Sequence, residues 1–250
     1  MPSEWFDTCG VPYRMWEDGR IQVGDAFPRY TSKYSLGIIE KIWSDYGKTI
    51  AAVSSKYGIP TSYLVGIIYI ESKGNPRAAS PCNAEVCPGL WKHGLCAAQG
   101  GPEKYCAGGL MQFISATARQ FGKTMTYFVE HPHEMIEAAA NLIVVGGPSG
   151  KNYGGGMRGR DGDILTVVKQ YNGGNPCSGG GITGHGGQND YVSGFVKTCN
   201  AFVGLRLGQG TEPVKADGAK NASLGSLATI GLVGGAAAFS FWLAGRNRWF

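Results

Sequence analysis

Charged residues are scarce in this sequence, and their scarcity excludes one broad class of protein. Only 16% of the 250 residues are Asp, Glu, Lys or Arg, whereas soluble proteins average about 25%. Apolar residues make up 43%, which is enough for a hydrophobic core and unlike the composition of a disordered chain. The formal net charge of +5 is compatible with an acidic polymer as partner but does not require one.

Two further patterns are missing from the chain. Its 41 glycines have no Gly-X-Y period, which excludes a collagen triple helix. The first residues lack a basic start followed by an apolar stretch, and they include Glu4 and Asp7. We therefore expect no secretory signal peptide.

The C-terminal end carries a long apolar run. No charged residue occurs from Asn221 to Gly245, and Trp242 and Arg246 stand near the end of this stretch. Because about 20 apolar residues span a bilayer and Trp and Arg favour its interfaces, we expect a transmembrane helix at 222–245. A polar linker at 205–221 would precede it. The alternative is a buried helical hairpin in a soluble domain.

The seven cysteines are unevenly distributed, since four of them fall between Cys82 and Cys106, near His93. A zinc site is one interpretation, but only the first of the two Cys spacings matches the usual zinc pattern. A disulfide-stapled loop is the favoured interpretation, and buried thiols are a third. The sequence does not determine the pairing, and one cysteine must remain odd. We expect no metal and no cofactor.

Apolar periodicity predicts a mainly α fold without convincing strands. Residues 1–34 are irregular, and 35–204 would form a catalytic domain with a cysteine-rich insertion at 81–108. Asp163 is expected to cap one of the helices. The predicted helical segments lie within 36–58, 63–71, 115–121, 135–145, 163–171 and 191–202.

Glu71 is the strongest candidate for a catalytic group. It ends Tyr63–Ile70, a segment that is apolar on all sides and therefore predicted to be fully buried. Burial disfavours a charged carboxylate, and the partial negative charge of a helix C-terminus disfavours it further. A carboxylic acid kept neutral in this way can donate a proton to a leaving oxygen.

Three motifs follow one another in order along the chain. The first is Glu71-Ser72-Lys73-Gly74-Asn75-Pro76, with Ser80 shortly after it, and the second is Gly109-Leu110-Met111-Gln112. The third is Tyr171-Asn172-Gly173-Gly174. Together they resemble the lytic transglycosylases of the lysozyme superfamily, of the soluble lytic transglycosylase type, and more distantly the goose-type lysozymes. The resemblance covers roughly residues 47–202.

This resemblance implies a lysozyme-like catalytic domain and a role for each matching residue. Glu71 would be the general acid and base. The implied substrate-binding residues are Ser80, Met111, Gln112, Tyr171 and Asn172, with Tyr171 facing the catalytic acid. The reaction implied is cleavage of the β-1,4 bond between N-acetylmuramic acid and N-acetylglucosamine in peptidoglycan glycan strands, with formation of a 1,6-anhydro ring.

Other functions remain open at this point. A hydrolytic lysozyme would need a second carboxylate, and a subunit that only binds glycan would need none. A nucleic-acid-binding helix-turn-helix at 53–67 is disfavoured, because a recognition helix needs a polar face that Tyr63–Ile70 lacks, so we expect no nucleic-acid partner. The candidates for a second carboxylate are Glu85, Glu103, Asp161, Asp163 and Asp190.

The expected place of action follows from the two chain ends. An apolar C-terminal helix without a signal peptide suits a membrane-anchored enzyme, either in a bacteriophage virion that opens the wall during genome entry or facing the periplasm. Other virion or envelope proteins would then be further partners.

Overall fold

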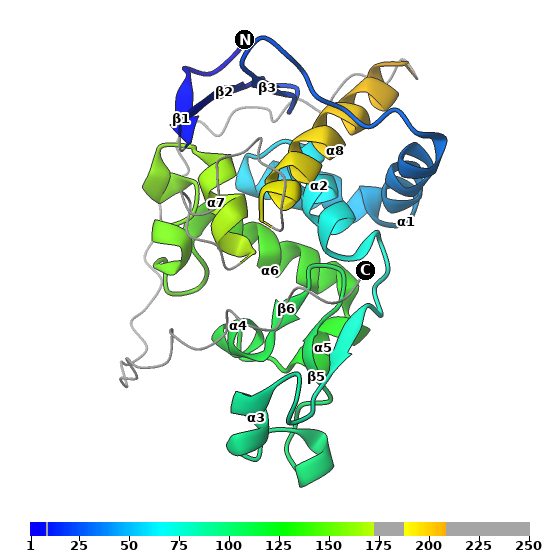
Figure 1. The fold of residues 1–250 in the computed structure, drawn as a ribbon, viewed down its shortest axis with the longest axis vertical. Coiled ribbons are helices and arrows are strands. Elements are labelled where there is room, and N and C mark those ends of the chain that lie inside the picture. Colours follow the sequence, from blue (N-terminus) through cyan, green and yellow to red (C-terminus); the bar gives the residue numbers. More distant parts are fainter. Residues whose placement is uncertain (9, 173–187, 209–250) are drawn as a thin grey trace.

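The computed structural model describes residues 1–8, 10–172 and 188–208 (Figure 1). Helices dominate this part of the chain, so the prediction of a mainly α fold is confirmed. The longer helices are α1 (Lys33–Tyr57), α2 (Thr61–Ser72), α6 (Pro132–Val145), α7 (Ile164–Tyr171) and α8 (Gln188–Gly208). The shorter ones are α3 (Pro88–Lys92), α4 (Ser115–Gln120) and α5 (Met125–Glu130), with single 3-10 turns at Ala97–Gln99, Asn152–Gly154 and Arg158–Arg160.

Helix α2 runs through the middle of the hydrophobic core. Its side chains from Ser62 to Tyr69 are buried, and α8 and α1 pack against it (Figure 1). The close approach of α8 depends on Gly66, where an added Cβ would come within 2.7 Å of the Phe195 ring. Because α2 has no exposed polar face, it cannot serve as a recognition helix in a DNA groove.

The ends of two helices show how the sequence encodes them. Ser32 caps α1, accepting a hydrogen bond from the Ser35 amide, and Gly58 ends that helix with a φ of 68° that favours glycine. The Asp163 carboxylate accepts from the Thr166 amide at 2.9 Å. This contact confirms the predicted cap of α7.

The N-terminal residues are not irregular, which corrects the sequence prediction. Strands β1 (Phe6–Thr8), β2 (Val11–Met15) and β3 (Ile21–Val23) form an antiparallel sheet in that order. The sheet lies against α7 and α8 at one end of the molecule (Figure 1). Strands of three to five residues leave too short an alternation for a periodicity argument to detect.

Buried hydrogen bonds fix this sheet to the helices. The Asn200 side chain on α8 accepts from the Ile21 amide at 2.7 Å and donates to the Ile21 carbonyl at 2.9 Å. The Tyr13 hydroxyl donates to the Asp163 carboxylate at 2.6 Å, and burial raises the pKa of that hydroxyl far above its usual range. The N-terminal sheet is therefore part of the same folded unit as the helices.

A second antiparallel sheet carries the cysteine-rich insertion. Its strands are β4 (Ala79–Pro81), β5 (Tyr105–Gly108) and β6 (Phe113–Ile114). Pro81 pairs with Tyr105, so the intervening residues extend from the end of the β4–β5 hairpin, where α3 projects away from the helical core (Figure 1). The pairing joins strands far apart in sequence, which explains why local patterns did not predict it.

Two disulfides hold the insertion together, one between Cys82 and Cys96 and one between Cys87 and Cys106. The favoured sequence interpretation is thus confirmed, and these sulfurs are not available to a zinc ion. In the described ranges, no group of His, Cys, Asp and Glu is arranged to hold a metal. The cystines form their own small core with Val86, Leu90 and Trp91, because so short a segment cannot bury enough apolar surface without such cross-links.

Glu103 connects the insertion to the rest of the domain. Its side chain is 1% exposed and accepts from the Met125 amide, at the start of α5, at 3.1 Å. Arg119 lies 3.9 Å away. Burial is the main cause of a pKa of Glu103 above its ordinary value of 4.5.

The raised pKa of Glu103 predicts a pH-dependent stability. The folded state holds the proton more tightly than the unfolded state, so this contribution is complete below about pH 4.5 and is lost as the pH rises through the folded-state pKa. Glu103→Gln keeps the acceptor for Met125 and removes the titration. We expect the free energy of unfolding of the variant, relative to the parent, to rise with pH across this window in urea titrations.

The control is Glu85→Gln, which changes an exposed carboxylate of the same insertion. A Glu103→Gln variant whose difference from the parent stays constant from pH 4 to pH 7 would contradict the assignment.

No helix within the described residues is long and apolar enough to cross a membrane. Residues 205–208 of the predicted linker belong to helix α8, which corrects that boundary. The rest of the linker and the predicted span at 222–245 lie outside the described residues.

Candidate active site

Glu71 stands at the C-terminal end of the central helix, as the sequence predicts. Helix α2 ends at Ser72 because Lys73 and Gly74 take positive φ values of 54° and 81°. The turn leaves the Glu71 side chain half-buried at the edge of the core. A carboxyl in this position is held by a rigid helix and still reaches the surface.

Tyr191 is the tyrosine that contacts Glu71. Its hydroxyl donates a hydrogen bond to Glu71 Oε1 from the first turns of α8, 120 residues further along the chain. The resemblance implied that Tyr171 faces the acid, whereas Tyr191 fell only within the predicted helical segment 191–202. A tyrosine on the same helix face as Phe195, Cys199 and Phe202 was the available signal, since the hydroxyl of a tyrosine packed among apolar residues needs a partner.

Tyr171 forms a hydrogen bond to the backbone of the Gly109–Gln112 motif. It ends α7, and its hydroxyl donates to the Met111 carbonyl at 2.7 Å. It therefore links α7 to the segment between β5 and β6. Asn172 follows as the cap of the same helix, with its amide donating to the Val168 carbonyl.

Gln112 joins two backbone segments next to the Glu71 loop. Its side-chain nitrogen donates to the carbonyls of Ala78 at 2.7 Å and Gly109 at 2.9 Å. Two carbonyl acceptors fix the orientation of the amide, because the flipped amide would place oxygen against oxygen. The donors of Gln112 are thus used within the protein, and its side-chain oxygen is the atom left for a ligand.

The remaining predicted binding residues lie on the same part of the fold. Ser80 is in β4, opposite Ala107 on β5 and two residues beyond the Ala78 carbonyl that Gln112 holds. Met111 is fully buried, so its side chain belongs to the core beneath this segment, and the residue acts through its carbonyl. Glu71 and Ser80 therefore lie on one short stretch of backbone, and the Gln112 side chain is hydrogen-bonded to that stretch at Ala78.

Two of the five candidate second carboxylates have structural roles. Asp163 caps α7 and accepts from Tyr13, while Glu103 is buried at the start of α5. Glu85 and Asp161 are exposed, in the insertion and after a 3-10 turn respectively. The side chain of Asp190 lies outside the described part of the chain. None of these observations assigns a water-activating base to the site.

A family model described as Transglycosylase SLT domain matches residues 48–180, which is more than half of the chain. The match begins within α1 and contains the three ordered motifs, Glu71–Pro76, Gly109–Gln112 and Tyr171–Gly174. No curated protein and no solved structure matches the chain.

Proposed function

Since the chain belongs to the Transglycosylase SLT domain family and is an enzyme that acts on peptidoglycan, we propose that Glu71 is its general acid and base. The observation that carries this proposal is the Tyr191 hydrogen bond to Glu71 at the end of the central helix. A carboxyl oriented by the hydroxyl of a half-buried tyrosine keeps one geometry while its protonation state changes. General acid and base chemistry requires that constancy.

In the proposed reaction, Glu71 protonates the oxygen of the glycosidic bond between N-acetylmuramic acid and N-acetylglucosamine. The C1–O bond breaks, and the positive charge that develops at C1 is stabilised by the acetamido group of the same sugar. Glu71 then removes the proton of the C6 hydroxyl, whose oxygen bonds to C1 and closes the 1,6-anhydro ring. The second carboxylate of most glycosidases has no step to perform in this sequence.

The proposed roles of the neighbouring residues follow from the polar side-chain atoms that they offer to a sugar. The Gln112 side-chain oxygen accepts the N–H of a sugar acetamido group, because its nitrogen is already committed to Ala78 and Gly109. Ser80 offers a hydroxyl from β4. The Tyr171 hydroxyl holds the Met111 carbonyl and so positions the Gly109–Gln112 motif.

The test is a digestion of purified peptidoglycan by the full chain, followed by mass spectrometry of the products. Products one water lighter at the muramic acid end are expected. Products with ordinary reducing ends would instead indicate a lysozyme that activates water. An absence of cleavage would indicate a glycan-binding subunit.

Tyr191→Phe is expected to lower kcat/KM about tenfold, because one hydrogen bond to the catalytic carboxyl is lost while the ring packing remains. Initial rates of muropeptide release measure the effect. Tyr34→Phe is the control, since Tyr34 is 77% exposed on α1. If Tyr191→Phe has the same rate as the parent, the Tyr191 hydroxyl does not contribute to catalysis.

The second part of the proposal concerns where the enzyme works. Its support is the uncharged apolar run of 222–245, which suits attachment to a membrane, and local wall opening during phage genome entry is the role proposed for it. Fractionation of the full chain with membranes, lost when 222–245 is deleted, tests the attachment. Detection of the chain in purified virions by mass spectrometry tests the role.

A further inference from the structure

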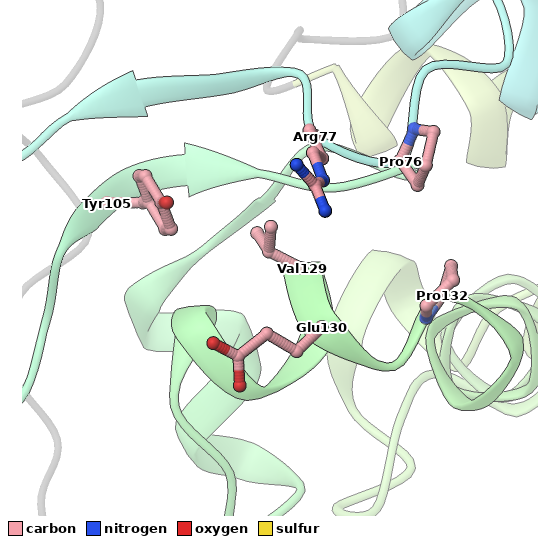
Figure 2. A pocket seen from close by; sticks show the side chains of 6 residues that line it. All are labelled: Pro76, Arg77, Tyr105, Val129, Glu130 and Pro132. Carbon is pink, nitrogen blue, oxygen red and sulfur yellow. The ribbon is translucent and has the colours of Figure 1, made fainter.

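An open recess lies beside the loop that follows Glu71. Its volume is about 440 Å³, within the range of small-ligand sites. It is bounded by the loop after α2, by strand β5 and by the corner between α5 and α6 (Figure 2). The residues that line it are Pro76, Arg77, Tyr105, Val129, Glu130 and Pro132.

The recess carries two opposite charges on an apolar floor. Arg77 and Glu130 come from its two sides, with Val129 between them (Figure 2). Both side chains are exposed, and within the described residues neither forms an ion pair or a side-chain hydrogen bond. A ligand that offers a carboxylate to Arg77 and a cation to Glu130 complements both charges.

A neutral glycan offers neither charge, whereas a peptide that bears both a carboxylate and a free amine offers both. Peptidoglycan contains such peptides, because the stem attached to each muramic acid carries carboxylates and the free amine of a diamino acid. We propose that the recess binds the stem peptide of peptidoglycan, with a stem carboxylate on Arg77 and the stem amine on Glu130. This inference rests on the proposed function.

A short piece of backbone joins the recess to Ser80, one of the proposed sugar-binding residues. Arg77 precedes Ala78, whose carbonyl is held by Gln112, and Ser80 follows two residues later. Three peptide units separate the Cα atoms of Arg77 and Ser80, so these atoms lie at most about 11 Å apart. An extended peptide covers about 3.3–3.6 Å per residue, so a stem of about four residues spans that distance from a muramic acid bound near Ser80.

The cysteine-rich insertion contributes one wall of the recess. Tyr105 forms one wall of the recess and is the first residue of β5, immediately before Cys106. The disulfide of Cys106 with Cys87, together with the pairing of Tyr105 with Pro81, fixes that wall relative to β4. The insertion would thereby hold one side of the stem-peptide site.

The experiment compares two substrates with the full chain: intact peptidoglycan, and glycan strands from which an amidase has removed the stems and whose newly freed lactyl carboxylates have been converted to neutral methylamides. For Arg77→Gln, we expect KM on intact peptidoglycan to rise roughly three- to tenfold with kcat unchanged, as befits an exposed charge contact. On stripped glycan the variant should match the parent. Arg158→Gln, which removes an exposed arginine elsewhere, should match the parent on both substrates.

A second variant, Glu130→Gln, tests the contact with the stem amine independently. It should raise KM on intact peptidoglycan by a similar factor and have no effect on peptidoglycan whose free amines have been acetylated. Equal effects of Arg77→Gln on intact and stripped glycan, or no effect on either, would overturn the proposal.

A binding measurement separates this proposal from the proposed function. The free tetrapeptide stem is titrated into the full chain carrying Glu71→Gln, with and without Arg77→Gln. Saturable binding that weakens with Arg77→Gln supports the recess even if the parent protein cleaves neither substrate, a result that would refute only the proposed function. Absence of saturable binding to the Glu71→Gln chain overturns the recess proposal while cleavage by the parent stands.

Discussion

Replacing Glu71 with glutamine is expected to reduce the release of anhydro-muropeptides by about 10²- to 10⁴-fold, the usual contribution of a general acid and base. The amide has the shape of the acid but can neither give up a proton to the glycosidic oxygen nor take one from the C6 hydroxyl. The Tyr191 hydroxyl can still donate to the amide oxygen, so the fold should be retained. Mass spectrometry of digested peptidoglycan measures the rate, and urea unfolding measures the stability.

Glu40→Gln is the matched control, because Glu40 is an exposed glutamate on α1. It should leave the rate unchanged. Residual activity of Glu71→Gln within a few-fold of the parent would mean that another residue transfers the proton, and would return attention to the exposed carboxylates Glu85 and Asp161.

The largest expected effect on stability is that of Phe195→Ala. Phe195 is fully buried between α8 and α2, where its ring lies 5.8 Å from that of Tyr63 and against Gly66. Truncating a buried phenylalanine costs about 3–5 kcal/mol, because the apolar contacts are lost and a cavity remains. A drop of the urea midpoint at unchanged m-value measures this loss.

This substitution should also affect catalysis, since Phe195 lies one helical turn after Tyr191. If Phe195→Ala does not fold, Phe195→Leu fills most of the volume and should cost less than about 1.5 kcal/mol. Tyr34→Ala, on the exposed face of α1, should change the stability by less than about 0.5 kcal/mol. A Phe195→Ala variant as stable as the parent would mean that α8 does not depend on this contact.

The helices that could be predicted are those with a long or clearly bounded apolar pattern. The periodicity at Ile164–Tyr171 and the apolar run before Glu71 each depend on neighbours three or four residues away, and local sequence encodes such contacts. Helices α4 and α5 have six residues each. Helix α4 was predicted because Gly122 marks its end, whereas no glycine closely follows α5 (Met125–Glu130). The strands were missed because each has only two to five residues and because β4 and β5 pair across the insertion.

The candidate site was predictable only in part, for the same physical reason. Glu71 was found from its place at the end of a buried helix, and Gln112 from its motif. The contact of Tyr191 with Glu71 was not predicted, because it depends on the packing of α8 along α2 and not on a local pattern. The committed donors of Gln112 likewise depend on the Ala78 carbonyl, 34 residues earlier.

The sequence by itself determined a mainly α fold through its apolar periodicity, and the resemblance of its ordered motifs indicated an enzyme of peptidoglycan. It also placed the candidate acid, Glu71, at the end of the most apolar helix, because periodicity and motifs are local properties. Tertiary structure decided which side chains meet. It placed Tyr191 on Glu71, made the N-terminal sheet part of the helical unit through Asn200 and Asp163, and set Arg77 opposite Glu130 around a recess. These contacts join residues distant in the chain, and their geometry is fixed by packing and buried hydrogen bonds rather than by any local pattern.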